Sequence, residues 1–182
     1  MDKQGGLTVM VEKTNNHSVY DEENGMIFGS LTKGSDIMEG IIQEYEKYDV
    51  QSGVVTCIGS LSQAAYVYLQ NDEVGKLSYS DLFIEEGPIE LVKGSGFLCR
   101  NEDGQTDFHL HAIFGDQHGK IFGGHIFPGH NPTLITVEFS IQVGKGIEAV
   151  RTFKPQLGFQ TITFQKGESE LGDIRKRLSE NI

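Results

Sequence analysis

The sequence predicts an α+β fold in which a mostly antiparallel β-sheet packs with one main helix. Short apolar runs rich in β-branched and aromatic residues recur along the chain, and Gly, Asn and Asp clusters separate them, which is typical of strands. One segment, residues 36–47, carries apolar residues at helical spacing. The 182 residues suit a single compact domain, because no composition break or linker divides them.

The first half of the chain is predicted to supply the helix. Asp36, with Glu39 three residues later, fits a capping box at its start. A strand at 26–31 precedes the helix. The apolar runs 54–59 and 64–69 follow it and predict two paired strands joined by a turn at 60–63, whose serines we expect to bond the local backbone.

The second half is predicted to be almost entirely strands. A turn at 85–88 leads into the apolar segment 89–98, and a loop at 127–132 precedes a strand at 134–143. Further strands are expected at 107–114, 120–127, 149–153 and 159–164. The expected organisation is an N-terminal extension (1–24), a domain (25–165) and a charged C-terminal tail (166–182). The extension, with an apolar patch at 7–11, is expected either to add an edge strand or to remain partly disordered.

Two histidines lie in the predicted strand 107–114, and a third lies in the strand that returns. Side chains alternate along a strand, so His109 and His111 share one face. Asp116 and Gly119 fit the first and last positions of a type I turn, which predicts a three-residue hairpin loop. This loop places His111 opposite His125, and all three imidazoles on one face.

The same register places His109 opposite Phe127. A loop of two or four residues would instead send His125 to the other face of the sheet. Opposed Cβ atoms lie about 5 Å apart and a ring nitrogen binds a metal at about 2.0–2.1 Å, so the three histidines could hold one metal with open positions. Gly123 and Gly124 are expected to leave room beside it for a ligand or another chain. Solvated or backbone-bonded histidines are the alternative.

Composition narrows the functional classes. The formal net charge of −11 opposes direct binding to nucleic acid, and the one basic cluster, residues 175–177, is short. Cys57 and Cys99 are too few for a disulfide framework and are expected to be buried thiols. The chain lacks a long apolar stretch and the pattern of a signal peptide, so we expect a soluble, cytoplasmic protein without a membrane partner.

Four motifs in order resemble the plants-and-prokaryotes-conserved (PPC) domain, over about residues 26–164. They are Gly59-Ser60-Leu61-Ser62, Glu86-Gly87-Pro88-Ile89-Glu90-Leu91, His109-Leu110-His111-Ala112 and Gly119-Lys120-Ile121-Phe122-Gly123-Gly124-His125. The resemblance implies an α+β domain that assembles as a homotrimer. It also implies that the free-standing prokaryotic type can hold a metal ion through the residues matching His109, His111 and His125. Plant members join the domain to AT-hooks, whereas this chain has no Arg-Gly-Arg-Pro hook.

Four interpretations of the function remain open from the sequence. The leading one is a trimeric protein with a three-histidine site for a divalent transition metal, zinc first, open to a small ligand. The second is a DNA-associated or transcription-related interaction module that acts through protein partners. Metal-dependent hydrolase or lyase chemistry would need a general base, for which the candidates are Glu90, Glu138, His130 or a neighbouring subunit's residue. Finally, the histidines could serve only to hold the trimer together.

Overall fold

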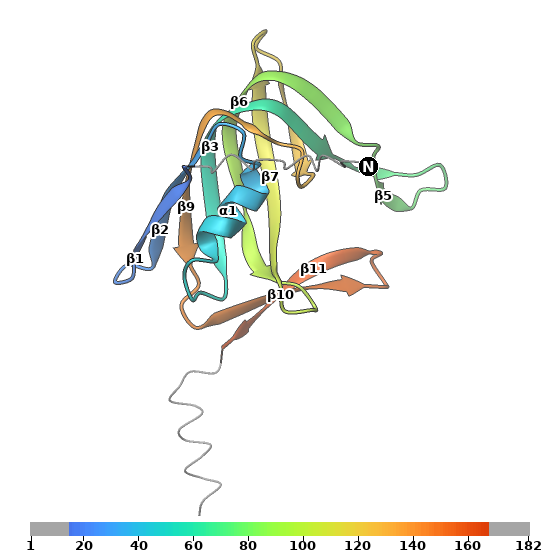
Figure 1. Cartoon of the computed structure of the whole chain (residues 1–182). Coiled ribbons are helices and arrows are strands. Elements are labelled where there is room, and N and C mark those ends of the chain that lie inside the picture. Colours follow the sequence, from blue (N-terminus) through green and yellow to red (C-terminus); the bar gives the residue numbers. More distant parts are fainter. Residues whose placement is uncertain (1–14, 168–182) are drawn as a thin grey trace, which may run out of the picture.

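The computed structural model describes residues 15–167, which form a nine-stranded sheet, a separate two-stranded hairpin and one helix (Figure 1). The strand order in the main sheet is β1-β2-β9-β3-β8-β7-β6-β10-β11, and the pairings are antiparallel except for one parallel bridge between β6 and β10. The elements are β1 (His17–Asp21), β2 (Met26–Thr32), α1 (Ile37–Tyr45), β3 (Gly53–Val67), β4 (Leu69–Asn71), β5 (Leu77–Tyr79), β6 (Phe83–Arg100), β7 (Thr106–Asp116), β8 (Ile121–Ile126), β9 (Thr133–Val143), β10 (Ile147–Lys154) and β11 (Phe159–Lys166). The predicted α+β class is confirmed.

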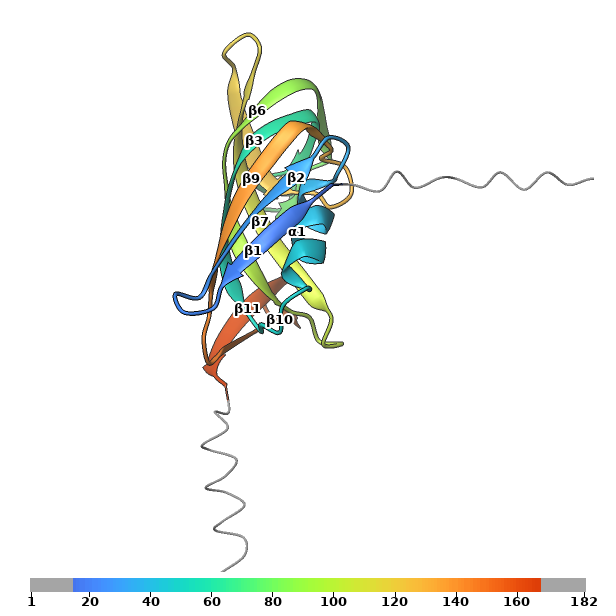
Figure 2. The same ribbon diagram turned by 60° about the vertical axis from the view of Figure 1, so that its left-hand side comes forward.

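Four strands of the sheet close on one another. Strand β3 pairs with β6, β6 with β7, β7 with β8, and β8 returns to the end of β3 through Tyr66 and Val67. The sheet therefore curls, as Figure 2 shows from its side. Strand β8 is hydrogen-bonded on both of its edges near its end, so the backbone there is held from two sides.

Helix α1 covers one face of this sheet, against β2, β7 and β9 (Figures 1 and 2). Asp36 is its N-cap, as predicted, and its carboxylate accepts hydrogen bonds from the backbone N–H groups of Met38 and Glu39. Ile37, Ile41 and Tyr45 are fully buried against the sheet. The core therefore sits between the helix and the sheet. Burial of each apolar side chain of this size stabilises the folded state by about 1.5–3 kcal/mol.

Two predicted turns are wrong, because both lie inside long strands. Residues 60–63 continue strand β3, where Leu61 is fully buried and the register shifts on both sides of it. The hydroxyl groups of Ser60 and Ser62 bond the backbone of the β9 segment instead of the local chain. Pro88 lies at the matching irregularity of β6, a position where its missing N–H interrupts no regular pairing.

The ends of the described chain add to the sheet. Residues 17–21 form β1, so part of the predicted extension is an edge strand paired with β2. The apolar patch at 7–11, the basic cluster at 175–177 and most of the predicted tail lie outside the described residues. Both cysteines are buried and unpaired, as predicted. Within residues 15–167, no helix is long and apolar enough to cross a membrane.

Candidate metal centre

The hairpin of β7 and β8 carries the three histidines in the predicted register. Backbone N–H of Asp116 donates to the carbonyl of Lys120 at 3.0 Å, and Gly119 adopts a φ of +82°, as the three-residue loop requires. His111 therefore lies opposite His125.

The expected pairing of His109 with Phe127 is wrong. The β7–β8 ladder ends at His111 and His125, and the N–H of Phe127 donates to the carbonyl of Ala65 in β3. The chain leaves β7 here because β8 also pairs with β3. His109 lies opposite Phe97 of β6 instead, still on the same face as His111.

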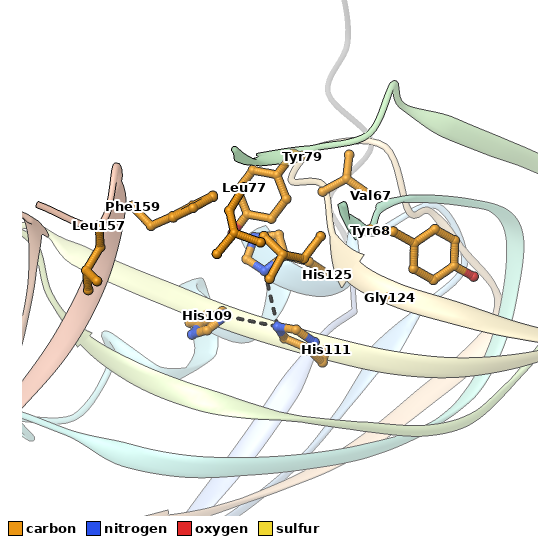
Figure 3. Close-up of a pocket in the computed structure, with 11 residues that line it drawn as sticks. Val67, Tyr68, Leu77, Tyr79, His109, His111, Gly124, His125, Leu157 and Phe159 are labelled. Carbon is orange, nitrogen blue, oxygen red and sulfur yellow. Dashed lines mark hydrogen bonds between the residues drawn. The ribbon is translucent and has the colours of Figure 1, made fainter. Parts of the chain in front are cut away.

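The three imidazoles converge on one point (Figure 3). One nitrogen from each ring lies within 4.8 Å of the others. His109 Nε2 is 3.1 Å from His111 Nε2, which in turn is 3.3 Å from His125 Nδ1. Ligands about 2.05 Å from a tetrahedral metal lie about 3.3 Å from one another, so the two nitrogen pairs that include His111 stand close to the spacing that a metal requires.

The surroundings keep these imidazoles neutral. Desolvation, followed by the charge of Arg151 and the neighbouring His111, lowers the pKa of His109 from 6.5 to about 4. Desolvation and the two other histidines lower the pKa of His125 to about 4, and burial also lowers the pKa of His111. Metals bind neutral imidazole, so the ligand form is present at neutral pH.

The lowered pKa values predict that acid destabilises the metal-free protein. Between pH 6.5 and about 4 the unfolded chain protonates these histidines while the folded chain does not, so the free energy of unfolding falls as the pH falls. Urea unfolding in a chelator at pH 7.0 and 5.0 measures this loss. It should shrink in a His109→Gln, His125→Gln double variant and persist in His130→Gln, whose exposed ring lies outside the cluster. Equal losses in all three proteins would refute the prediction.

A cavity of about 410 Å³ opens beside the three imidazoles, and a second of about 720 Å³ adjoins it at His125. The wall of the first cavity includes Leu77 and Tyr79 from the β4–β5 hairpin and Phe159 from the β10–β11 hairpin (Figure 3). The Tyr79 ring lies 5.3 Å from the His125 ring and 5.3 Å from the Phe159 ring. The histidines therefore face a partly enclosed, largely apolar space.

Most of the chain matches the model of a known protein family. Residues 20–144 match the Plants and Prokaryotes Conserved (PCC) domain, which is more than half of the chain. The chain belongs to this family. The resemblance seen in the four sequence motifs is thereby confirmed, and the PPC-domain assignment covers β2 to β9 in full together with the end of β1.

Solved structures share the fold at low sequence identity. A Bacteroides thetaiotaomicron protein described as a candidate DNA-binding protein superposes with a TM-score of 0.69 and 18% identity, over 81% of this chain and 97% of that one. A metal-containing protein from Archaeoglobus fulgidus superposes with a TM-score of 0.65 and 21% identity, over 80% of this chain and 98% of that one. A PPC protein from Pyrococcus horikoshii superposes with a TM-score of 0.62 and 18% identity, over 74% of this chain and 89% of that one.

A curated relative shares only a segment. The chain is 32% identical over 100 residues to the bifunctional protein GlmU of Synechococcus sp. (strain JA-3-3Ab). That match covers 54% of this chain and 14% of the relative. The similarity therefore concerns a small part of that larger protein.

Gly123 and Gly124 line the hollow beyond His111, and Gly124 also lines the cavity beside all three histidines. Their missing side chains are also needed for strand packing. A Cβ on Gly123 would collide with the carbonyl oxygen of Ala112 in β7, and one on Gly124 would lie 2.7 Å from that of Val67 in β3. The glycines let β8 fit between its two neighbours in the PPC sheet.

None of the three candidate bases lines the described cavities beside the histidines. Glu90 is exposed on β6 opposite Gly115, and His130 is exposed in the loop before β9. Glu138 is exposed on β9, which confirms the interpretation that it points to solvent and excludes it as a partner of these imidazoles.

The sequence did not single out Tyr79, Phe159 or Arg151 as residues near the site. The three-residue strands β4 and β5 are too short to show periodicity. Arg151 sits in a predicted strand whose position relative to the histidines depends on distant pairing. The two hairpins carry only scattered aromatic residues, Tyr79, Phe153, Phe159 and Phe164, a pattern that is also typical of ordinary strands.

Proposed function

We propose that this PPC-domain protein binds one divalent transition metal, zinc first, through His109, His111 and His125, and that open positions on the metal receive a small ligand. The observation that carries the proposal is the convergence of three ring nitrogens, two of them 3.1 and 3.3 Å from His111 Nε2. A metal with three neutral imidazoles keeps its full positive charge for that ligand.

Hydrogen bonding alone is a poorer account of this cluster. A ring nitrogen of neutral imidazole carries either one proton or one lone pair, so it makes one hydrogen bond in its plane. His111 Nε2 has two ring nitrogens within 3.3 Å and can bond only one of them in this way. A metal ion can satisfy all three nitrogens at once. The description of the Archaeoglobus fulgidus structure as metal-containing also supports the proposal.

Metal content measured by elemental mass spectrometry on tag-free protein tests the proposal. We expect about one metal ion per chain in the wild type and loss of the metal in a His109→Ala, His111→Ala double variant. His118→Ala is the matched control, because His118 is an exposed imidazole in the turn of the same hairpin. The control should keep its metal. A wild type without metal, or a double variant that retains it, would refute the proposal.

We also propose that the protein assembles as a homotrimer, in keeping with the family resemblance. Large apolar side chains are exposed on adjoining strands of the sheet, among them Phe28, Ile58 and Ile135. Burial of such side chains between subunits would stabilise an oligomer. Light scattering coupled to size exclusion should give three times the mass of the 20.1 kDa chain, whereas a monomer mass would reject the assembly.

An interaction module that acts through protein partners is the second candidate. The same exposed apolar side chains favour it, and structural relatives are described as candidate DNA-binding proteins. The net charge of −11 makes a protein partner a better fit than DNA itself, so we expect no DNA shift even at low salt. Metal-dependent hydrolysis is less well supported, since no carboxylate lines the described cavities beside the histidines.

A further inference from the structure

The cavities beside the histidines differ in charge from the chain as a whole. The sequence has 26 acidic and 15 basic residues, yet the described lining of the two cavities that meet at His125 contains Lys76 and Arg151 and no acid. The remaining lining is mostly apolar, including Val67, Leu77, Tyr79, Phe153, Leu157 and Phe159. Cationic groups in the lining of a largely apolar space suit an anion with an apolar body.

Arg151 of β10 is the cation placed to recognise such an anion. Its side chain is 12% exposed and lines the larger cavity together with His125. Only Nη1 has a partner, the Asp107 carboxylate at 3.3 and 3.4 Å, and the buried Nε has none among the described residues. The buried Nε is closed to a ligand, so the donors that remain for one are those of Nη2, and the planar guanidinium matches the geometry of a carboxylate. Its effect on the pKa of all three imidazoles agrees with this proximity.

The β4–β5 and β10–β11 hairpins lie outside the closed set of strands β3, β6, β7 and β8, and they enclose the space next to Arg151 and the histidines. Tyr79 from β5 lies against His125 at an interplanar angle of 31°, and Phe159 from β11 meets Tyr79 edge-on. Figure 3 shows both rings on the same side of the histidines as Leu77 and Leu157. Volumes of about 410 and 720 Å³ fall within the usual range for small-molecule sites.

We propose that this cavity binds a monocarboxylate with an apolar body, such as a medium-chain or aromatic acid. Arg151 contacts the carboxylate beside the histidine cluster, and the two hairpins enclose the apolar body. The inference builds on the proposed function, because a metal at the histidines supplies the second positive charge for the same carboxylate. It adds the chemical class of the ligand, which the three histidines alone do not define.

Calorimetric titration of the full chain, zinc-loaded and metal-free, with acetate, octanoate and octan-1-ol tests this proposal. Octanoate should bind to the zinc-loaded protein at least about tenfold more tightly than acetate, since each buried methylene adds affinity. Arg151→Gln should weaken octanoate binding by about tenfold or more, with Arg151→Lys intermediate, and leave octan-1-ol unaffected. Phe159→Ala should weaken octanoate but not acetate. Lys93→Gln is the control, since Lys93 lines the separate hollow beyond His111.

The outcomes separate this inference from the metal proposal. One metal per chain, with octanoate bound no more tightly than acetate or equally well by folded Arg151→Gln, would overturn the ligand class and leave the metal site standing. If the chain holds no metal, the proposed function fails. If the metal-free protein then binds octanoate, and Arg151→Gln weakens this binding, the proposed carboxylate site in the cavity still stands. If the metal-free protein does not bind octanoate, the carboxylate site is overturned as well. Circular dichroism on each variant verifies that it is folded.

Discussion

Zinc is expected to raise the melting temperature of the metal-free protein by about 8–16 °C. A ligand that binds only the folded state at 1,000 times its dissociation constant adds about 4.1 kcal/mol to the free energy of unfolding. For a domain of this size, 1 kcal/mol shifts the midpoint by about 2–4 °C. The effect requires the three nitrogens to be assembled in the folded chain and separated in the unfolded one, as their origin in two strands implies.

Differential scanning calorimetry of chelator-treated protein with and without zinc measures this shift. The His109→Ala, His111→Ala variant should melt at the same temperature in both conditions, and His118→Ala should shift as the wild type does. A shift of similar size in the double variant would mean that zinc stabilises the fold from another place.

Gly96→Ala is expected to lower the stability of the folded protein by about 3 kcal/mol, or the melting temperature by about 6–12 °C. Gly96 lies on β6 opposite Leu110 of β7. A Cβ there would collide with the carbonyl oxygen of His109 and lie 2.9 Å from the Leu110 Cα. Both are backbone atoms, which cannot rotate away as a side chain can. Strands β6 and β7 must therefore move apart at His109, the first of the three histidines.

Gly115→Ala is the matched control for this substitution. It also lies in the β6–β7 pair, opposite Glu90, but its added Cβ would be 3.5 Å from Ile121 Cδ1, an ordinary contact. Thermal unfolding should therefore change little in Gly115→Ala. Zinc titration should show weaker binding in Gly96→Ala than in the control, because the His109 ring moves with its backbone. Similar melting temperatures for the two variants would contradict this account.

Local chemistry explains which features of the site could be predicted from the sequence. Asp116 and Gly119 define the turn between β7 and β8, and a defined turn sets the register of a hairpin. The opposition of His111 and His125 follows from that turn alone. The helix could also be predicted from the sequence, because its N-cap Asp36 and the apolar spacing after it lie within one segment.

The missed features depend on contacts between distant segments. Residues 60–63 are polar enough for a turn, but pairing with β6 and β9 on both sides draws them into one long strand. Likewise, β8 leaves β7 for β3 beyond His125, which removes Phe127 from the predicted ladder. The approach of Tyr79 and Arg151 to the histidines is tertiary in the same sense, and no local pattern encodes it.

The double pairing of β8 has a consequence for how the site would exchange its metal. His125 lies in a backbone held by both Val67 and His111, and His109 lies two residues before His111 on the same face of β7. Small zinc domains depend on their metal to fold, whereas here a nine-stranded sheet with its own buried core holds the backbone of the histidines. Loss and recapture of the ion can then proceed at a preorganised site in the native state, at a rate set by ligand exchange rather than by refolding.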